Sequence, residues 1–194
     1  MLINLEGIDG CGKSTQSKFL MDKFESNNEE IILLKEPTNG KYGQKLWEML
    51  SGKIEANTEE ILELFVLDRK EHVNQKIRPA LDEGRIVLMD RYYYSTMAYQ
   101  AAAGIDVSRI RKDNEFAPKP DIVLIFDLPA DLAMKRVRSH SVADVFEKEE
   151  YLEKVRKAYL NLENDSLVRI IDATGTPKKI FDEVWRLVSE VRNG

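Results

Sequence analysis

The sequence predicts one α/β domain, a doubly wound parallel sheet of five strands with helices covering both faces. Five short, continuously apolar segments alternate along the chain with segments of helical periodicity. An unbroken apolar run is typical of a strand buried on both faces, as the strands of a parallel sheet are. The length suits one such domain, so residues 1–194 are expected to fold as a single unit.

The first half of the chain supplies three of these strands. The predicted strands are 2–5, 31–34 and 86–89, and the predicted helices are 13–24, a short one around 46–50, and 58–81. Asn57 precedes the long helix and Glu60 follows three residues later, which is the spacing of an N-cap and its reciprocal partner. Pro37 and the Asn-Gly pair that follows it mark the connection before the short helix as a loop.

The second half supplies the other two strands. The predicted strands are 122–127 and 168–172, and the predicted helices are 92–104, one from 106 that ends before the Pro-Lys-Pro run at 118–120, 130–136, 146–162 and 177–191. A polar interruption at 139–144 separates the helix that ends near Arg136 from the helix that begins at Phe146. Ligands bind such sheets at the carboxyl ends of the strands, so the residues just after each strand are the candidate site residues.

A P-loop lies between the first strand and the first helix. It reads Gly7-x-x-x-x-Gly12-Lys13-Ser14, in the strand-to-helix context that this motif requires. Glycines allow successive backbone N–H groups to point at phosphate oxygens, and the positive end of the helix dipole faces the same anion. Lys13 can reach the β- and γ-phosphates and the Ser14 hydroxyl can coordinate Mg²⁺. The motif therefore predicts a site for a nucleoside triphosphate.

Composition and charge limit the other classes of partner. The net charge is −5 without a basic tract, which disfavours an extended nucleic-acid surface. No apolar run reaches the length of a membrane span, and the N-terminus reads as a core strand with no signal-peptide pattern. The single cysteine, Cys11, excludes an internal disulfide and suits a reducing cytoplasm. We therefore expect a cytoplasmic protein with no nucleic-acid or membrane partner.

The third strand is followed directly by Asp90 and Arg91. A carboxylate at this place can help to hold Mg²⁺ in P-loop enzymes, although a strand-end aspartate can also cap the next helix. Arg91, together with Arg69 on the long helix and Lys35 after the second strand, suggests a second phosphate opposite the first.

Several segments in this order resemble those of thymidylate kinases. The segments are Gly7-Ile8-Asp9-Gly10-Cys11-Gly12-Lys13-Ser14-Thr15, Glu36-Pro37, Leu64-Phe65-Val66-Leu67-Asp68-Arg69, Asp90-Arg91-Tyr92 and Ser95-Thr96-x-Ala98-Tyr99-Gln100. The resemblance runs in register from residue 1 to about 136, and it implies the P-loop NTPase fold. It also implies transfer of the γ-phosphoryl group of ATP to dTMP, giving dTDP and ADP with Mg²⁺ as cofactor, in dTTP biosynthesis. Members of this family are usually homodimers, and the wide apolar girth of the 61–81 helix suits a subunit interface.

The resemblance also implies roles for individual residues. The ATP site would comprise Gly7, Ile8, Asp9, Gly10, Cys11, Gly12, Lys13, Ser14, Thr15 and Arg136, with Arg136 beside the adenine and Ser14 and Asp90 at the metal. The dTMP site would comprise Asp9, Glu36, Pro37, Phe65, Arg69, Arg91, Tyr92, Thr96, Tyr99 and Gln100. Asp9, Lys13 and Arg91 would take part in the catalysis.

Within the dTMP site, each part of the nucleotide has its expected partners. Asp9 would lie near the sugar 3′-hydroxyl and the acceptor phosphate, which Arg91 and Arg69 would grip. Phe65 would stack on thymine, and Thr96 and Gln100 would hydrogen-bond its edge. Tyr99 would lie where a ribose 2′-hydroxyl would project.

Local sequence gives some of these residues a plainer interpretation. Phe65 lies in an apolar helical run and could belong to the core. Arg69 could belong to a solvated helix face, and His72 reads as a surface residue. Of the three consecutive tyrosines that begin at Tyr92, we expect some to pack in the interior and one to lie near the substrate.

A lid is expected at about 136–147, and it departs from the family pattern. Family lids carry arginines ahead of an Asp-Arg-Phe-Glu signature, whereas this chain reads Asp-Val-Phe-Glu at 144–147. The P-loop holds no arginine either, so the lid must supply the cation for the migrating phosphoryl group. Arg136, Arg138 and His140 remain, and our hypothesis is that Arg138 is the catalytic residue.

Two other functional classes compete with this interpretation. A kinase of the same architecture could act on dUMP, on another monophosphate or on a nucleoside, and Thr96 and Gln100 would be the discriminating residues. A GTP-binding switch without an acceptor is disfavoured, because the chain holds no Asn-Lys pair of the kind that reads guanine. An ATPase domain driving a partner would have no use for an arginine-rich acceptor site.

Overall fold

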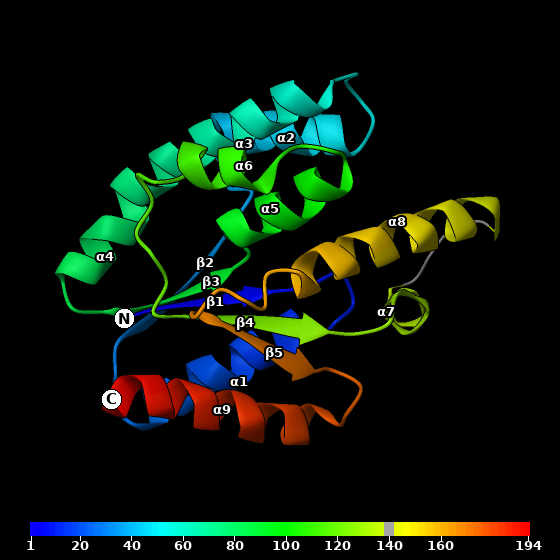
Figure 1. The fold of residues 1–194 in the computed structure, drawn as a ribbon. Coiled ribbons are helices and arrows are strands. Elements are labelled where there is room, and N and C mark those ends of the chain that lie inside the picture. Colours follow the sequence, from blue (N-terminus) through cyan, green and yellow to red (C-terminus); the bar gives the residue numbers. More distant parts are fainter. Residues whose placement is uncertain (138–141) are drawn as a thin grey trace.

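The chain folds around a parallel sheet whose middle strand is the first one. The computed structural model describes residues 1–137 and 142–194, and for 142–148 it describes the backbone alone. The strands are β1 (Leu2–Glu6), β2 (Ile31–Lys35), β3 (Ile86–Asp90), β4 (Ile122–Asp127) and β5 (Val168–Asp172). All neighbours pair in parallel in the order β2-β3-β1-β4-β5 (Figure 1), which confirms the predicted five-stranded sheet.

Helices cover both faces of the sheet. On one side lie α1 (Lys13–Ser26) and α9 (Pro177–Asn193). On the other lie α2 (Lys41–Leu50), α3 (Thr58–His72), α4 (Arg78–Asp82), α5 (Tyr93–Ala102), α6 (Val107–Asp113) and α8 (Val142–Leu160), and the short α7 (Ala130–Arg136) lies past the end of β4 (Figure 1). The doubly wound arrangement is therefore as predicted. Within the described residues, no helix is both long and apolar enough to cross a membrane.

Burial along the strands explains why they could be recognised. Every residue of β1 and β3 is buried, since helices cover both faces of these central strands. The edge strands β2 and β5 are partly exposed instead, and Leu33 of β2 is 45% exposed. The carboxyl ends of β1 and β3 meet in register, with Leu5 opposite Asp90. This places the P-loop beside the residues that follow β3.

The long helix predicted for 58–81 is continuous but contains one wide turn. Its start is confirmed, because the Asn57 side chain accepts from the Glu60 N–H at 3.0 Å and the Glu60 side chain accepts from the Asn57 N–H at 3.0 Å. A π-helical turn, η1 (Val73–Ile77), joins α3 to α4. Pro79 follows it, and a proline has no N–H to donate and crowds the carbonyl four residues before it, which favours a locally widened helix.

Two element boundaries differ from the sequence-based expectation. Helix α6 ends at Asp113, earlier than the Pro-Lys-Pro run, because the buried Asn114 side chain turns back to donate to the Ile110 carbonyl at 2.7 Å. Helix α8 begins at Val142, so the segment predicted as a polar interruption is helical from that residue on, and so is much of the expected lid. Polar residues without glycine or proline remain compatible with a solvated helix, so polarity alone did not mark a break.

Candidate active site

The P-loop owes its shape to backbone that only glycine adopts readily. Gly7 has φ 131° and Gly10 has φ 85°, both in the left-handed range. A side chain at Gly7 would place its Cβ 2.7 Å from the Phe126 carbonyl oxygen, and one at Gly10 would collide with the Ala133 carbonyl. The loop is therefore packed against β4 and α7 by backbone contact, and helix α1 begins at its end with Lys13.

Lys13 spans the inside of this loop. Its Nζ donates to the carbonyls of Gly7 and Ile8 at 3.0 and 3.1 Å and lies 3.7 Å from the Sγ of the buried Cys11. Burial lowers the pKa of the ammonium, and the nearby charge of Arg91 lowers it further. The next two residues, Ser14 and Thr15, are exposed at the start of the helix and line the adjoining hollow.

A hollow of about 520 Å³ brings together the ends of several elements. Its lining comprises Asp9, Gly10, Cys11, Gly12, Lys13, Ser14, Thr15, Gln16, Lys35, Asp90, Arg91, Arg136, Gly175, Pro177 and Ile180. These residues end or follow β1, β2, β3 and β5, lie in the first turns of α1 and α9, or end α7, as expected for a ligand site at the carboxyl edge of a parallel sheet. A second hollow of about 660 Å³ is lined by β2, α2 and η1 and lacks the P-loop. Its greater size does not make it the phosphate site, since phosphate recognition requires the N–H groups and lysine of the loop.

Asp90 is suited to a metal ion. Its side chain is nearly buried and its Oδ1 accepts no hydrogen bond from the part of the chain that the structure describes, while Oδ2 lies 3.8 Å from Lys35 Nζ. Asp90 does not cap the following helix, since the N-cap of α5 is Tyr92 and has no side-chain hydrogen bond. Among the described residues there is no cluster of three or more metal-binding side chains. Asp90 and Ser14 therefore fit Mg²⁺, which commonly takes one or two protein ligands and completes its shell with phosphates and water.

Arg91 crosses the hollow from the P-loop side to α5. Its Nη2 donates to Asp9 Oδ1 at 2.7 Å and approaches the Tyr99 hydroxyl at 3.4 Å, and its guanidinium lies 5.3 Å from the centre of the Tyr99 ring. Its backbone has φ 71°, unusual for a residue with a side chain, and is pinned by a 3.0 Å hydrogen bond from its N–H to the Leu5 carbonyl. Strain of this kind persists where the surrounding structure holds a residue for function.

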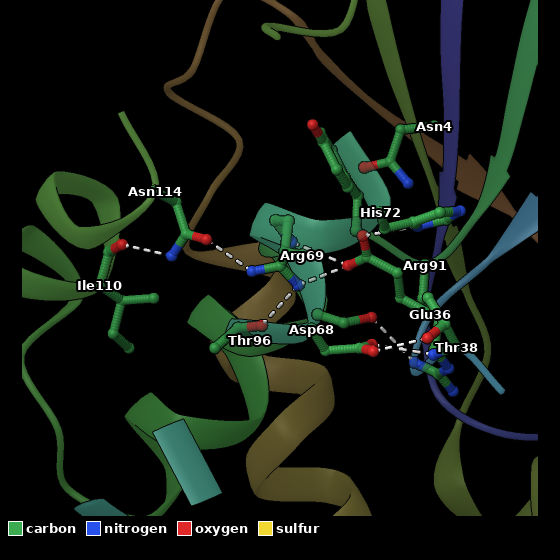
Figure 2. A network of polar contacts seen from close by, with 12 residues as sticks. Asn4, Glu36, Thr38, Asp68, Arg69, His72, Arg91, Thr96, Ile110 and Asn114 are labelled. Atoms are coloured by element: carbon green, nitrogen blue, oxygen red, sulfur yellow. Dashed lines mark hydrogen bonds and ion pairs between the residues drawn. The ribbon is translucent and has the colours of Figure 1, made fainter. Parts of the chain in front are cut away.

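Arg69 lies in a second, fully buried network (Figure 2). It is 1% exposed, its Nε donates to Glu36 at 2.8 Å, and its two amino groups donate to Asn114 at 2.6 Å and Thr96 at 3.1 Å. The alternative of a solvated helix face is therefore wrong. The donors of Arg69 point to Thr96 and Asn114, and among the described contacts it does not meet Arg91.

His72 was expected at the surface, and that expectation is wrong. It is 7% exposed, and its Nδ1 lies 3.1 Å from Glu36 Oε1, one helical turn beyond Arg69 (Figure 2). The face of α3 that carries Arg69 and His72 points inward, where both side chains contact the buried Glu36 carboxylate. The neighbouring Asp68 accepts from the Thr38 N–H at 2.8 Å and so holds the loop after Pro37.

Comparison with known proteins agrees with the resemblance noted in the sequence. A family model described as thymidylate kinase matches residues 5–184. This chain belongs to the thymidylate kinase family. It is 39% identical to a probable thymidylate kinase of Archaeoglobus fulgidus over 194 residues, covering 100% of this chain and 97% of the relative. It is 46% identical over 163 residues to a thymidylate kinase of Desulfotalea psychrophila (83% of this chain, 81% of the relative), and 40% identical to a probable thymidylate kinase of Thermococcus kodakarensis (97% of each).

The residues that the family resemblance assigns to thymine lie along α3 and α5. Thr96 and Gln100 are one helical turn apart and buried, and Gln100 Oε1 has no hydrogen-bond partner among the described residues. Phe65 is partly exposed and stays outside the described apolar core, so the core interpretation is not supported. A buried amide oxygen without a partner among the described residues is consistent with a site for a hydrogen-bonding ligand.

The three consecutive tyrosines prove to be interior residues. Tyr92 is fully buried with its ring 5.4 Å from the Arg69 guanidinium, Tyr93 stacks on Tyr94, and the Tyr94 hydroxyl donates to Asp165 at 2.9 Å. The expectation that one of the three lies near the substrate therefore finds no support for Tyr93 or Tyr94. The Tyr92 ring lies against the Arg69 guanidinium, and Tyr99 is the tyrosine of α5 that contacts Arg91.

The expected lid residues are only partly described. Arg136 ends α7, lines the hollow and donates to the Ala173 carbonyl at 3.4 Å. Arg138 and His140 lie outside the described residues, so their assignment stays a hypothesis. Sequence reasoning missed Asn114, which pairs with Arg69, and a buried group of Glu6, Ser95 and Tyr159 behind Arg91. The one available signal was Glu6, a charged residue at the end of a mostly apolar strand.

Proposed function

We propose that this chain is a thymidylate kinase that transfers the γ-phosphoryl group of ATP to dTMP, giving dTDP and ADP, in dTTP biosynthesis. The observation that carries the proposal is the meeting of two phosphate-directed groups in one hollow. The P-loop with Lys13 lines this hollow, and Arg91, which follows β3, lines it too and donates to Asp9 of the loop at 2.7 Å. A donor and an acceptor phosphate placed there would lie close together, which supplies the positioning on which phosphoryl transfer depends.

On the donor side, the P-loop residues and Lys13 would hold the phosphates of ATP and Arg136 would flank the adenine. Ser14 and Asp90 would hold Mg²⁺, since both line the hollow and one carboxylate oxygen of Asp90 has no hydrogen-bond partner within the described part of the chain. Bound there, Mg²⁺ would supply positive charge that offsets the charge of the phosphates. Lys13 must leave the Gly7 and Ile8 carbonyls to reach the phosphates, and its present contacts keep it directed into the loop.

On the acceptor side, Arg91 would bind the dTMP phosphate with the forked donors of its guanidinium. Asp9 would lie near the sugar 3′-hydroxyl, and Tyr99, whose pKa burial raises to about 12, would contact the deoxyribose as a neutral phenol. Thr96 and Gln100 would read the edge of thymine while Phe65 stacks on its face. Because its donors already serve Glu36, Asn114 and Thr96, Arg69 would act by fixing the Thr96 hydroxyl, not by gripping the phosphate.

Arg138 remains the candidate for the catalytic cation. The loop variables of the P-loop contain no arginine, and the transition state of phosphoryl transfer gains from a cation on the migrating group. The expected surroundings are cytoplasmic, and the working form is a homodimer. Support for a dimer comes from exposed apolar residues on α2, where Trp47 is 46% and Leu50 is 50% exposed, beside the partly exposed apolar side of α3. Light scattering of wild type and Leu50→Glu would test this interface.

The first experiment measures ADP formation with ATP and Mg²⁺, comparing no acceptor with dTMP, dUMP, dCMP, dGMP, AMP and thymidine. Strong stimulation by dTMP with weaker stimulation by dUMP is the expected result. Preference for another acceptor would overturn the roles given to Thr96, Gln100 and Tyr99. ADP formation that no acceptor stimulates would overturn the kinase assignment.

A further inference from the structure

Arg91 is held from behind by a group of three buried side chains, Glu6, Ser95 and Tyr159. Its Nη1 donates to Ser95 Oγ at 3.1 Å and to Tyr159 Oη at 3.2 Å. Both hydroxyls hydrogen-bond to the same oxygen of Glu6, Ser95 by a short contact and Tyr159 at 3.0 Å. The other Glu6 oxygen accepts from the Tyr92 N–H at 2.7 Å. The group is completely removed from solvent at Glu6 and nearly so at Tyr159.

The direction of these hydrogen bonds is fixed by counting protons. A serine or tyrosine hydroxyl has one proton to donate and lone pairs to accept with. Since Glu6 as a carboxylate can only accept, the hydroxyl protons point toward it, directly or through the 2.8 Å contact between Ser95 and Tyr159. The lone pairs of both oxygens are then left facing Nη1 of Arg91. The carboxylate thus turns two ordinary hydroxyls into a matched pair of acceptors.

The two amino groups of Arg91 consequently serve different purposes. Nη1 is committed to the buried group, while Nη2 faces Asp9 and the hollow. Burial raises the pKa of the Glu6 carboxyl, and Arg91, Ser95, Tyr92 and Tyr159 act against that rise. The Glu6 charge balances the Arg91 guanidinium through the Ser95 and Tyr159 hydroxyls, and it leaves Nη2 of Arg91 directed toward the ligand.

We propose that Glu6, Ser95 and Tyr159 form a positioning group that sets the orientation of the Arg91 guanidinium toward the acceptor phosphate. The three residues come from β1, α5 and α8, so the placement of one arginine depends on elements far apart in the chain. The inference rests on the proposed role of Arg91 in binding that phosphate. It adds residues that touch no ligand and act through Arg91.

The test is a pair of matched tyrosine variants. Tyr159→Phe removes the hydroxyl that meets Arg91 and Glu6, and Tyr94→Phe removes a similar hydroxyl that donates to Asp165 at 2.9 Å, away from Arg91. We expect Tyr159→Phe to raise KM for dTMP by about tenfold, the value of one hydrogen bond to a charged group, with KM for ATP unchanged. Tyr94→Phe also loses one hydrogen bond to a charged group, so it should lower thermal stability, but it should leave both KM values unchanged.

Three further variants separate this inference from the role of Arg91. Ser95→Ala should raise KM for dTMP in the same direction, and the Ser95→Ala/Tyr159→Phe double variant should show a non-additive effect, since both hydroxyls serve one guanidinium. Arg91→Lys keeps a charge but loses the fork, and it should raise KM for dTMP more than either. If Arg91→Lys raises KM while Tyr159→Phe behaves like Tyr94→Phe, the positioning group is overturned alone. If Arg91→Lys has no effect on KM for dTMP, the proposed role of Arg91 falls and the positioning group falls with it.

Discussion

Replacing Arg69 by Met tests whether its buried network stabilises the fold. Arg69 and Glu36 are 1% and 2% exposed and lie 2.7 Å apart, so water cannot replace the lost partner. The variant leaves the Glu36 carboxylate with His72 as its remaining side-chain partner among the described contacts. Removing one member of a buried pair typically costs about 3–5 kcal/mol. For a domain of this size, at about 2–4 °C per kcal/mol, the expected loss in Tm is about 6–20 °C.

Urea denaturation of Arg69→Met, Glu36→Gln and the double variant would measure the coupling. We expect the double variant to be destabilised by less than the two single variants combined, with a coupling energy of about 1–3 kcal/mol, since the double variant leaves no unpaired charge. Arg109→Met is the matched control, because its 2.7 Å ion pair with Glu59 is solvent-exposed and should contribute no measurable stability. A coupling energy below about 0.5 kcal/mol would refute the reasoning, since pairs that do not interact are additive within that range.

Three other predictions concern catalysis, the metal and pH. Arg138→Ala should lower kcat by about 10³-fold or more with little change in KM for dTMP. Lys135→Ala, on the neighbouring helix, is the control and should keep the wild-type kcat. A wild-type kcat in Arg138→Ala would remove Arg138 from the mechanism. Asp90→Asn should raise the Mg²⁺ concentration for half-maximal rate by about tenfold, and an unchanged Mg²⁺ dependence would contradict its role at the metal. Burial raises the pKa of Asp165, but hydrogen bonds from the Leu167 N–H and Arg111 outweigh it and leave the pKa below its ordinary value of 3.8. A lowered pKa in the folded state means that this carboxylate stabilises the fold at neutral pH and loses that contribution as the pH falls through its folded value. The stability difference between wild type and Asp165→Asn, measured by urea denaturation across pH, should therefore shrink in acid and not grow.

The fold could be predicted from the sequence because its determinants are local. The central strands are buried on both faces, so each consists mostly of apolar residues, and the P-loop glycines mark the turn after β1. The Asn57–Glu60 cap is similarly written in four consecutive residues. The residues that line the hollow follow the strands, which is where the topology of a parallel sheet places a ligand.

The buried polar contacts could not be predicted in the same way, because their partners are distant in the chain. His72 looked like a surface residue because its neighbours Lys70 and Glu71 are charged, and its partner Glu36 lies 36 positions away. Asn114 meets Arg69 across 45 positions, and Tyr159 meets Glu6 across 153. Local periodicity carries no information about such pairs. The start of α8 was misplaced for a different reason, since a solvated helix and a polar loop share a composition.

The wide turn of η1 changes the directions in which the side chains of α4 point relative to those of α3. A π turn holds one residue more than an α turn, and each residue of an α-helix advances the direction of its side chain by about 100°. Arg69 and His72 of α3 contact Glu36 before this turn, and Ala80 of α4 is buried after it, so the extra residue sets the angle between the two faces. Deleting Gln75 would let α3 and α4 join as one regular α-helix. The buried face of one of these helices would then rotate away from its partners. A single inserted residue can thus let one continuous helix contact the buried Glu36 carboxylate with one part and bury apolar side chains with another.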